Sequence, residues 1–307
     1  MAVLTTPGDA DAQARPGRWR PMPALEGYGF LLPALAVLLG LVAFPFADGV
    51  LTSFTDRAVA RPGTFNGLSN YRQLFADPIF RLAVVNSVLL TVAAVAAKLV
   101  LGLAGAVLLA ERFPLRGLAR TLIFLPWAIP ALIAGLSWRW MFDETNGVFN
   151  AVLLGVGLVS EQIYWLSEPS LGRLSIAVAM VWHGLPFFIM MFLAGLAAIP
   201  NDLYEAAAID GAGAWRRFRS VTLPSLRDVI ATTSMLSLIW TFNSFHMVFI
   251  LTGGGPANRT HILPTLAYEV GMRRSQLGLG AAVMVSFVPV LVVMIVLLTR
   301  RMLREER

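Results

Sequence analysis

Few side chains in this sequence are of the types that perform chemistry, and their spacing does not form a catalytic group. The chain has no cysteine, three histidines and a single lysine, Lys98. The lack of cysteine excludes disulfides, thiol catalysis and cysteine-ligated metal sites. No histidine pair has the spacing of metal ligands, no glycine-rich loop is followed by the lysine of a phosphate-binding loop, and no nucleophile elbow occurs. We therefore expect no metal site and no catalytic residue.

The composition instead indicates a membrane protein. Apolar residues make up 57% of the chain, charged residues 14%, and the mean hydropathy is +0.71. Soluble domains have about 45–50% apolar and about 25% charged residues. The net charge of +6 fits arginine-rich cytoplasmic loops better than nucleic-acid binding. We expect lipid contact and no nucleic-acid partner.

Charge-poor runs long enough to cross a membrane predict an all-α polytopic protein with six spans. The domain 26–300 holds spans at about 28–47, 82–110, 121–140, 174–199, 229–252 and 276–299. More arginines fall in the inner segments if both termini, 1–25 and 301–307, are cytoplasmic tails. The first span is long for a signal peptide, so we expect a retained anchor. The short run 145–160 predicts an interfacial or re-entrant helix. Four tryptophans are expected in interface belts: Trp127, Trp138, Trp140 and Trp165.

The cytoplasmic segment 201–227 predicts two short helices joined by a turn. Asp202 is a candidate N-cap with Glu205 three residues later, and Gly211 suits the left-handed residue that ends a helix. Pro224 is expected to end the second helix. By themselves these features also fit an amphipathic loop at the lipid surface.

The spacing within this loop is more specific. Glu205-Ala206-Ala207, three residues, Gly211, nine residues and then Val221-x-Leu223-Pro224 resembles the EAA loop of permease subunits of ATP-binding cassette (ABC) importers, with Val221 in place of isoleucine. Further segments resemble the carbohydrate-type permeases, in particular the maltose-permease-F-like and glycerol-phosphate-permease-A-like members. These segments are Gly67-Leu68-Ser69-Asn70-Tyr71, Asp77-Pro78, Asn86, Trp182-x-Gly184-x-Pro186-Phe187 and Leu251-Thr252-Gly253-Gly254-Gly255-Pro256. The resemblance extends over about 28–300.

The resemblance implies the type I ABC importer permease fold in a bacterial inner membrane. A second permease subunit would complete a heterodimer, two ATPase subunits would bind at the cytoplasmic side, and an extracytoplasmic binding protein or lipoprotein would deliver the solute. This chain would bind no cofactor, because ATP and Mg²⁺ belong to the ATPase subunits. The residues implied in coupling to the ATPase are Glu205, Ala206, Ala207, Asp210, Gly211, Leu223 and Pro224.

The resemblance also implies a solute path. His183, Gly184 and Phe187 match sugar-contacting positions in the maltose-permease pattern, and Thr241 and Ser244 match similar positions on the fifth span. Asn243 and His246 are further polar candidates there. Spacing of three or four residues places His183 with Phe187, and Thr241 with Ser244, on one helix face. A sugar site needs polar partners and an aromatic surface, but polar groups in membrane helices also bond to neighbouring helices.

The transported solute stays open at this point. Disaccharides or oligosaccharides of the trehalose or maltose type are the main expectation, with glycerol phosphate or its diesters as the alternative. A stand-alone secondary transporter should show acids or broken helices in the spans for ion coupling, and it would not need the spacing found in the loop 201–227. The span interiors hold no acid. Lys98 is the one full charge deep in a span, so it is a candidate functional residue that could instead reach the interface or pair with the sister permease.

Overall fold

The computed structural model describes residues 24–111 and 113–305, and it divides into one unit that ends at Asp48 and one that runs from Gly49 to Arg307. The predicted N-terminal tail lies outside the described residues up to position 23, as do positions 306–307 of the predicted C-terminal tail. In the first unit, α1 (Ala24–Leu38) leads through a π-helical turn, η1 (Leu39–Ala43), into α2 (Phe44–Thr52), whose last residues, from Gly49, belong to the second unit. The run Leu31–Thr52 is long and apolar enough to cross a membrane.

Two helices of the second unit are also long enough to cross a membrane: α4 (Pro78–Ala110) and α8 (Pro169–Ala197). Both begin in the same way. The Asp77 carboxylate accepts a hydrogen bond from the amide of Ile79, and the Glu168 carboxylate accepts one from the amide of Leu171. A proline follows each acidic cap. The first N–H groups of a helix have no acceptor within the helix, so the N–H that proline lacks is not missed there. Both helices begin earlier than the predicted spans at about 82 and 174, because the predicted starts follow the charges Arg81 and Arg173.

Two further candidate spans are broken helices. The predicted run 121–140 consists of α5 (Arg116–Ala128) and α6 (Ala131–Met141), which meet at 96°. The run 229–252 consists of α12 (Arg227–Phe242) and α13 (Phe245–Leu251), which meet at 44°. Among the described residues, three helices qualify as spans, or up to five if each bent pair is one span. The predicted sixth span falls on α15 (Leu277–Val285) and α16 (Val288–Glu305), whose apolar part Leu277–Val293 is shorter.

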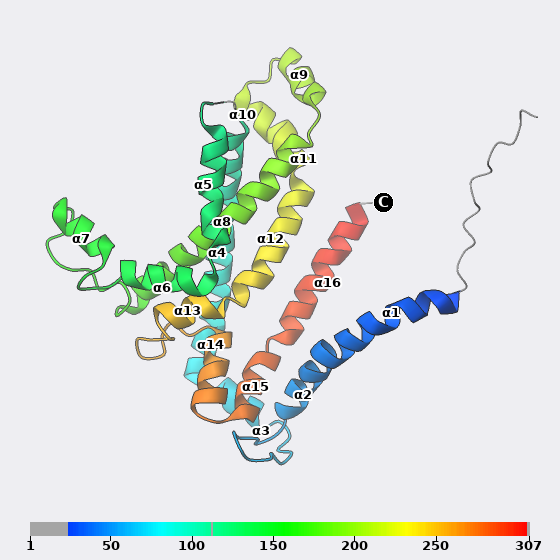
Figure 1. Ribbon diagram of the computed structural model, residues 1–307, viewed down its shortest axis with the longest axis vertical. Helices are drawn as coiled ribbons and strands as arrows, with labels where there is room; N and C mark the ends of the chain where they lie inside the picture. The colour runs from blue at the N-terminus through cyan, green and yellow to red at the C-terminus, as the bar shows by residue number, and fades with distance from the viewer. Residues whose placement is uncertain (1–23, 112, 306–307) are drawn as a thin grey trace, which may run out of the picture. The chain divides into compact units, whose positions relative to one another are not determined.

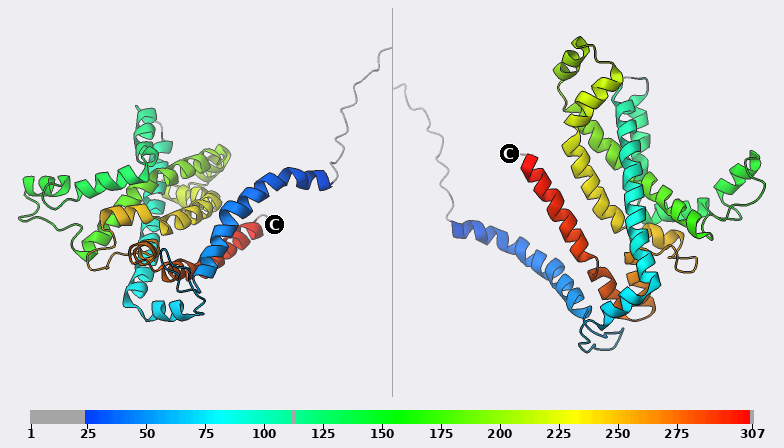
Figure 2. Two further views of the ribbon diagram at one scale, coloured as in Figure 1. Left: turned by 60° about the horizontal axis from the view of Figure 1, so that its bottom comes forward. Right: turned by 180° about the vertical axis from the view of Figure 1, so that it is seen from behind.

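The remaining helices gather at the two ends of the second unit, as Figure 1 shows. At one end, called here the α9 end, lie α9 (Asn201–Ile209), α10 (Ala214–Arg217), η2 (Phe218–Thr222) and α11 (Leu223–Ser225). At the other, the α3 end, lie α3 (Ser69–Ala76), α14 (Leu263–Tyr268) and η3 (Glu269–Arg273). The right-hand view of Figure 2 shows α4 running between the two ends, while α12 runs from the α9 end toward α13. The short α7 (Val148–Gly155) falls within the run 145–160 that predicted a short helix.

Two of the π-helical turns end two residues before a proline: η1 ends at Ala43, before Phe44 and Pro45, and η2 ends at Thr222, before Leu223 and Pro224. In each turn the residue ahead of the proline donates its amide to the carbonyl five residues back: Phe44 to Leu39, and Leu223 to Phe218. A proline has no N–H, and its ring collides with the carbonyl four residues back in a regular helix. The wider turn accommodates the ring, so the helical path continues through Pro224 and the prediction that Pro224 ends the helix is wrong.

The core of the second unit lies where α8 packs on α4, α6 and α13. Its fully buried side chains are small or apolar, for example Ala94, Ile176, Ala179 and Val248. Outward faces of the same helices expose large apolar side chains such as Val85 and Leu174, which suits contact with lipid. The described residues form no β-strand, only two isolated bridges in the loop that precedes α3.

Candidate functional site

A cavity of about 320 Å³ lies where α4, α5, α8 and the broken helix α12–α13 converge. It is lined by aromatic rings, hydroxyls, an amide, two imidazoles and one ammonium group, and by no carboxylate. The lining residues are Lys98, Trp127, Ala131, Met180, His183, Gly184, Phe187, Ser237, Trp240, Thr241, Asn243, Ser244, His246 and Met247. All seven residues predicted for the solute path are in this set, so the structure brings them together around one space.

The break between α12 and α13 brings four of these residues to the cavity. Thr241 is in the last turn of α12, Asn243 and Ser244 form the break, and His246 is in the first turn of α13. The Asn243 side-chain amide donates a 2.9 Å hydrogen bond to the carbonyl of Ile239, which fixes its orientation. Irregular backbone at membrane depth is tolerated where it lines a cavity, so this break fits a site within a span.

His183 connects α8 to the second broken helix. Its Nε2 donates to the carbonyl of Ile129 over 3.2 Å, and Ile129 is the residue that follows α5 at the 96° bend. The bend leaves carbonyls at the end of α5 without intrahelical partners. His183 therefore braces this bend as well as lining the cavity.

Lys98 is the lysine of the cavity wall, and only 3% of its surface is exposed. Its Nζ donates to Ser237 Oγ over 2.9 Å and to Thr241 Oγ1 over 2.7 Å, which joins α4 to α12. Gly184 makes room for it, because a Cβ at that position would lie 2.9 Å from Lys98 Cδ. Gly184 was predicted to line the solute path. The structure shows why a glycine suits this position, since the Lys98 side chain packs directly on it.

Aromatic rings form one wall of the cavity. The rings of Phe187 and Trp240 lie 5.1 Å apart between centroids, and Trp127 faces the same space from α5. The sequence analysis missed Trp240 and Ser237, although Ser237, Trp240, Thr241 and Ser244 recur at the helical spacing of three or four. This helical spacing could have identified both residues from the sequence.

The assignment of tryptophans to interface belts needs correction. Trp127 lines the cavity, and Trp138 is 7% exposed and stacks on Phe142 in the core. Trp165 donates its indole N–H to Asn150 Oδ1 over 3.0 Å, which anchors the loop after α7. Trp127, at 51%, and Trp140, at 61%, are the two of the four that are well exposed. Trp138 and Trp165 therefore belong to the packed part of the protein, and composition alone does not reveal it.

The predicted coupling loop, 201–227, forms the tip of the α9 end (Figure 1). Helix α9 starts after Pro200 without a side-chain cap, and Asp202 lies in its first turn, so the predicted capping by Asp202 is wrong. The helix ends as predicted at Gly211, which has a φ of +73°. The amide of Gly211 donates to the Ala208 carbonyl over 3.0 Å and that of Ala212 to the Ala207 carbonyl over 2.9 Å. This pair of bonds is a Schellman motif, which ends a helix sharply.

The surface of this tip is open. Glu205, Ala206, Asp210, Gly211, Leu223 and Pro224 are exposed, and Ala207 is half-buried. Two large apolar side chains are also exposed, Ile209 at 87% and Trp215 at 73%. Trp215 is held by stacking on Phe218, with ring centroids 5.5 Å apart. An exposed apolar tip on an ordered turn is typical of a surface that a partner protein covers.

At the α3 end, the residues of the carbohydrate-permease motifs hold loops together. The Asn70 side chain donates to the carbonyls of Ser53 and Thr55, both over 2.8 Å. The Asn86 side chain donates to the carbonyls of Arg259 and His261. These asparagines are therefore structural, and neither of them lines the cavity.

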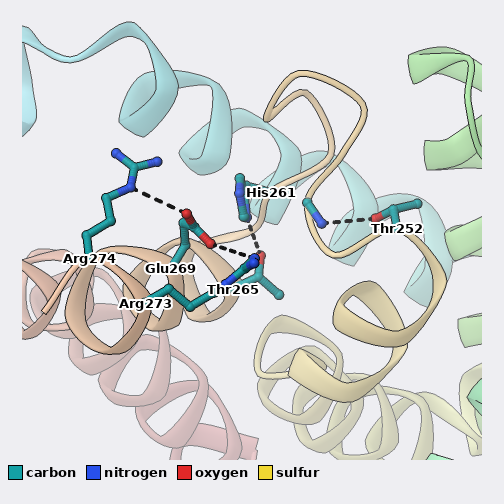
Figure 3. Close-up of polar contacts among 7 residues, drawn as sticks. Thr252, His261, Thr265, Glu269, Arg273 and Arg274 are labelled. Atoms are coloured by element: carbon teal, nitrogen blue, oxygen red, sulfur yellow. Dashed lines mark hydrogen bonds and ion pairs between the residues drawn. The ribbon is translucent and has the colours of Figure 1, made fainter.

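A buried histidine lies in the same region. His261 Nδ1 lies 3.1 Å from Thr265 Oγ1. Figure 3 shows this pair beside Glu269 and its two arginine partners. Glu269 pairs with Arg273 over 3.1 Å and with Arg274 over 3.4 Å. Burial lowers the pKa of His261 below its usual value, and the neighbouring Glu269 carboxylate opposes that shift. Among the described residues, no cluster of His, Asp and Glu has the geometry of a metal site.

Comparison with known proteins identifies the family. The model of the family described as binding-protein-dependent transport system inner membrane component matches residues 98–304. The trehalose/maltose transport system permease protein MalF of Thermococcus litoralis is 35% identical over 267 residues, which covers 86% of this chain and 90% of that one. The sulfoquinovosyl glycerol transport system permease protein SmoG of Agrobacterium fabrum is 36% identical over 257 residues, 83% of each chain.

A solved structure has the same fold. A bacterial ABC transporter involved in the import of the acidic polysaccharide alginate superposes with a TM-score of 0.79 over 91% of this chain and 96% of that chain, at 22% sequence identity. The predicted fold class is thereby confirmed as that of ABC importer permeases. Because the family model matches residues 98–304 and relatives are more than 30% identical along most of the chain, this chain belongs to the family of binding-protein-dependent transport system inner-membrane components.

Proposed function

We propose that this chain is the permease subunit of an ATP-driven importer and forms half of the path for a sugar. The observation that carries the proposal is the cavity at the α12–α13 break, which brings together every residue predicted for the solute path. Its Phe187 and Trp240 rings offer a surface for a sugar ring, and Ser244 and Asn243 offer partners for hydroxyls. Family relatives named for trehalose, maltose and sulfoquinovosyl glycerol support a sugar over glycerol phosphate.

In this proposal the α9 end faces the cytoplasm and receives force from an ATPase subunit. Ala206 and Ala207 are small and allow close approach, Glu205 and Asp210 supply charge, and Gly211 fixes the turn. Leu223 and Pro224 lie on the path that leads from the tip to α12. The exposed Ile209 and Trp215 support burial of this tip in a cleft of the partner.

The assembly would contain a second permease subunit, two ATPase subunits and an extracytoplasmic binding protein that docks at the α3 end. ATP and Mg²⁺ would be bound by the ATPase subunits, because this sequence has no phosphate-binding loop. Both termini would be cytoplasmic. The six predicted spans would include three that each consist of two helices: α5–α6, α12–α13 and α15–α16. Alternating access would then be rigid-body movement of the helices around the cavity.

Reconstitution tests this proposal. The complete importer is placed in liposomes, and uptake of labelled sugars is measured with ATP, without ATP, and without the binding protein. The expected result is accumulation that needs both ATP and the binding protein. Accumulation driven by a proton or sodium gradient in the absence of ATP would contradict the proposal and favour a secondary transporter.

A further inference from the structure

The ammonium group of Lys98 has one hydrogen-bond donor left for a ligand. A lysine ammonium has three N–H donors, and the structure assigns two of them, to Ser237 and Thr241. Lys98 is nonetheless part of the cavity wall. Two short bonds from neighbouring turns of α12 hold Nζ in place, and Gly184 leaves the room that the side chain needs. The group is thus a positioned cation at the edge of the proposed solute site.

No negative charge within the described residues balances this cation. Neither the Arg227–Asp228 pair nor the pairs of Glu269 with Arg273 and Arg274 involve a residue of the cavity wall, and no Asp or Glu lines it. The titratable side chains of the wall other than Lys98 are His183 and His246, which add positive charge or none. An ammonium group buried without a counter-ion is costly, and an oxyanion in the cavity would remove that cost.

The remaining walls suit the rest of such a ligand. Phe187 lies one helical turn from Gly184, against which Lys98 packs, and its ring contacts that of Trp240. A sugar ring stacked on this pair would have its hydroxyls near Ser244 and Asn243. The cavity therefore combines an aromatic platform, neutral polar groups and one cation, but no acid.

We propose that Lys98 binds an anionic substituent, a carboxylate, sulfonate or phosphate, on the transported sugar. The proposal deepens the function proposed above and depends on it. Ser237 and Thr241 are positioning residues in this account, because they act by holding Nζ. Charge-assisted hydrogen bonds are stronger than neutral ones, so the ammonium would select acidic sugars over neutral sugars of the same size.

The test uses the complete importer in liposomes with a mixture of neutral and acidic sugars. The neutral members are trehalose, maltose and cellobiose, and the acidic members are trehalose 6-phosphate, sulfoquinovosyl glycerol and uronic-acid disaccharides. Mass spectrometry of the lumen identifies what accumulates. We expect an acidic member, with its uptake rate reduced about tenfold or more in Lys98→Met and within about threefold of wild type in Lys98→Arg.

Two further variants make the result decisive. Arg81→Met removes an exposed positive charge from the same helix outside the cavity and should leave uptake unchanged. If Lys98→Met fails to assemble with its partners, Lys98→Gln keeps a donor without the charge and should show the same loss. Accumulation of neutral sugars alone, or wild-type uptake of an acidic sugar by Lys98→Met, would overturn the role of Lys98. Absence of ATP-dependent accumulation of every sugar would instead contradict the proposed function.

Discussion

The Tyr204 hydroxyl lies 3.0 Å from the Thr222 hydroxyl and joins α9 to the π-helical turn η2. Thr222 is buried, and its carbonyl accepts the amide of the fully buried Leu226, the residue directly before α12. Helix α12 carries Ser237 and Thr241 to the cavity. A continuous set of contacts therefore leads from the exposed tip to the proposed solute site, and a movement of α9 has a structural route to the cavity.

Tyr204→Phe tests this route by removing one hydroxyl. A single hydrogen bond contributes about 1 kcal/mol, so we expect the importer to assemble normally while sugar uptake per ATP hydrolysed falls a few-fold. The measurement is uptake and ATP hydrolysis in the same liposomes. Tyr164→Phe is the matched control, because Tyr164 is exposed in the loop after α7 and its hydroxyl makes no hydrogen bond to the described residues. Equal coupling ratios in the two variants would argue against the route.

Gly211→Val tests the shape of the tip. At a φ of +73°, a β-branched residue is strained by about 1–2 kcal/mol or more, and the Schellman motif at the end of α9 would be distorted. We expect transport to fall about tenfold while the permease still co-purifies with its sister subunit. Gly211→Asn is the control, since asparagine tolerates the left-handed region. Normal substrate-stimulated transport by Gly211→Val would contradict a role of this turn in coupling.

The sequence predicted local features well and tertiary bends poorly. Gly211 was identifiable because a left-handed helix end has a strong residue preference. The starts of α4 and α8 were predicted too late, at about 82 and 174, although an acid followed by proline marks each of them. The grouping of His183, Phe187 and Ser244 followed from the family resemblance and helical spacing. The 96° bend between α5 and α6 did not follow, because Pro130 marks a break without giving its angle. Trp127, which was expected only in an interface belt, also lines the cavity while 51% of its surface is exposed.

Pro224 illustrates the same limit on a smaller scale. A proline after a run of helix formers predicts an end, yet η2 widens the helix just before it and the helical path continues. The same arrangement occurs at η1 ahead of Pro45, so a proline in such a run does not by itself predict a helix end.

Phe187→Ala tests the aromatic wall of the cavity. Loss of a ring that packs on Trp240 removes about 1 kcal/mol or more of favourable contact with a stacked sugar ring. We expect the sugar concentration for half-maximal uptake to rise about fivefold, with ATP hydrolysis in the absence of substrate unchanged. Phe113→Ala, in the exposed loop between α4 and α5, serves as the control. A kinetic profile identical to wild type for Phe187→Ala would remove this residue from the site.

His261→Gln tests the buried histidine shown in Figure 3. Burial lowers its pKa in the folded protein below the ordinary value of 6.5, so the unfolded chain binds a proton more readily than the native protein. Stability should therefore decrease as the pH falls below 6.5 and be unaffected by this group at higher pH. We expect thermal unfolding in detergent to shift downward between about pH 7.5 and about pH 5, and to shift less in His261→Gln. An equal shift in both proteins would show that His261 is not responsible.

The central claim is that the α9 tip contacts an ATPase subunit, and site-specific crosslinking tests it most directly. The chain has no cysteine, so each introduced cysteine is the only one. A photoreactive maleimide is attached to Ala206→Cys on α9, or to Phe65→Cys, an exposed position in the loop before α3. In the intact importer, the account predicts an adduct with the ATPase subunit from Ala206→Cys and none from Phe65→Cys. No ATPase adduct from Ala206→Cys, or an equal yield from Phe65→Cys, would contradict it.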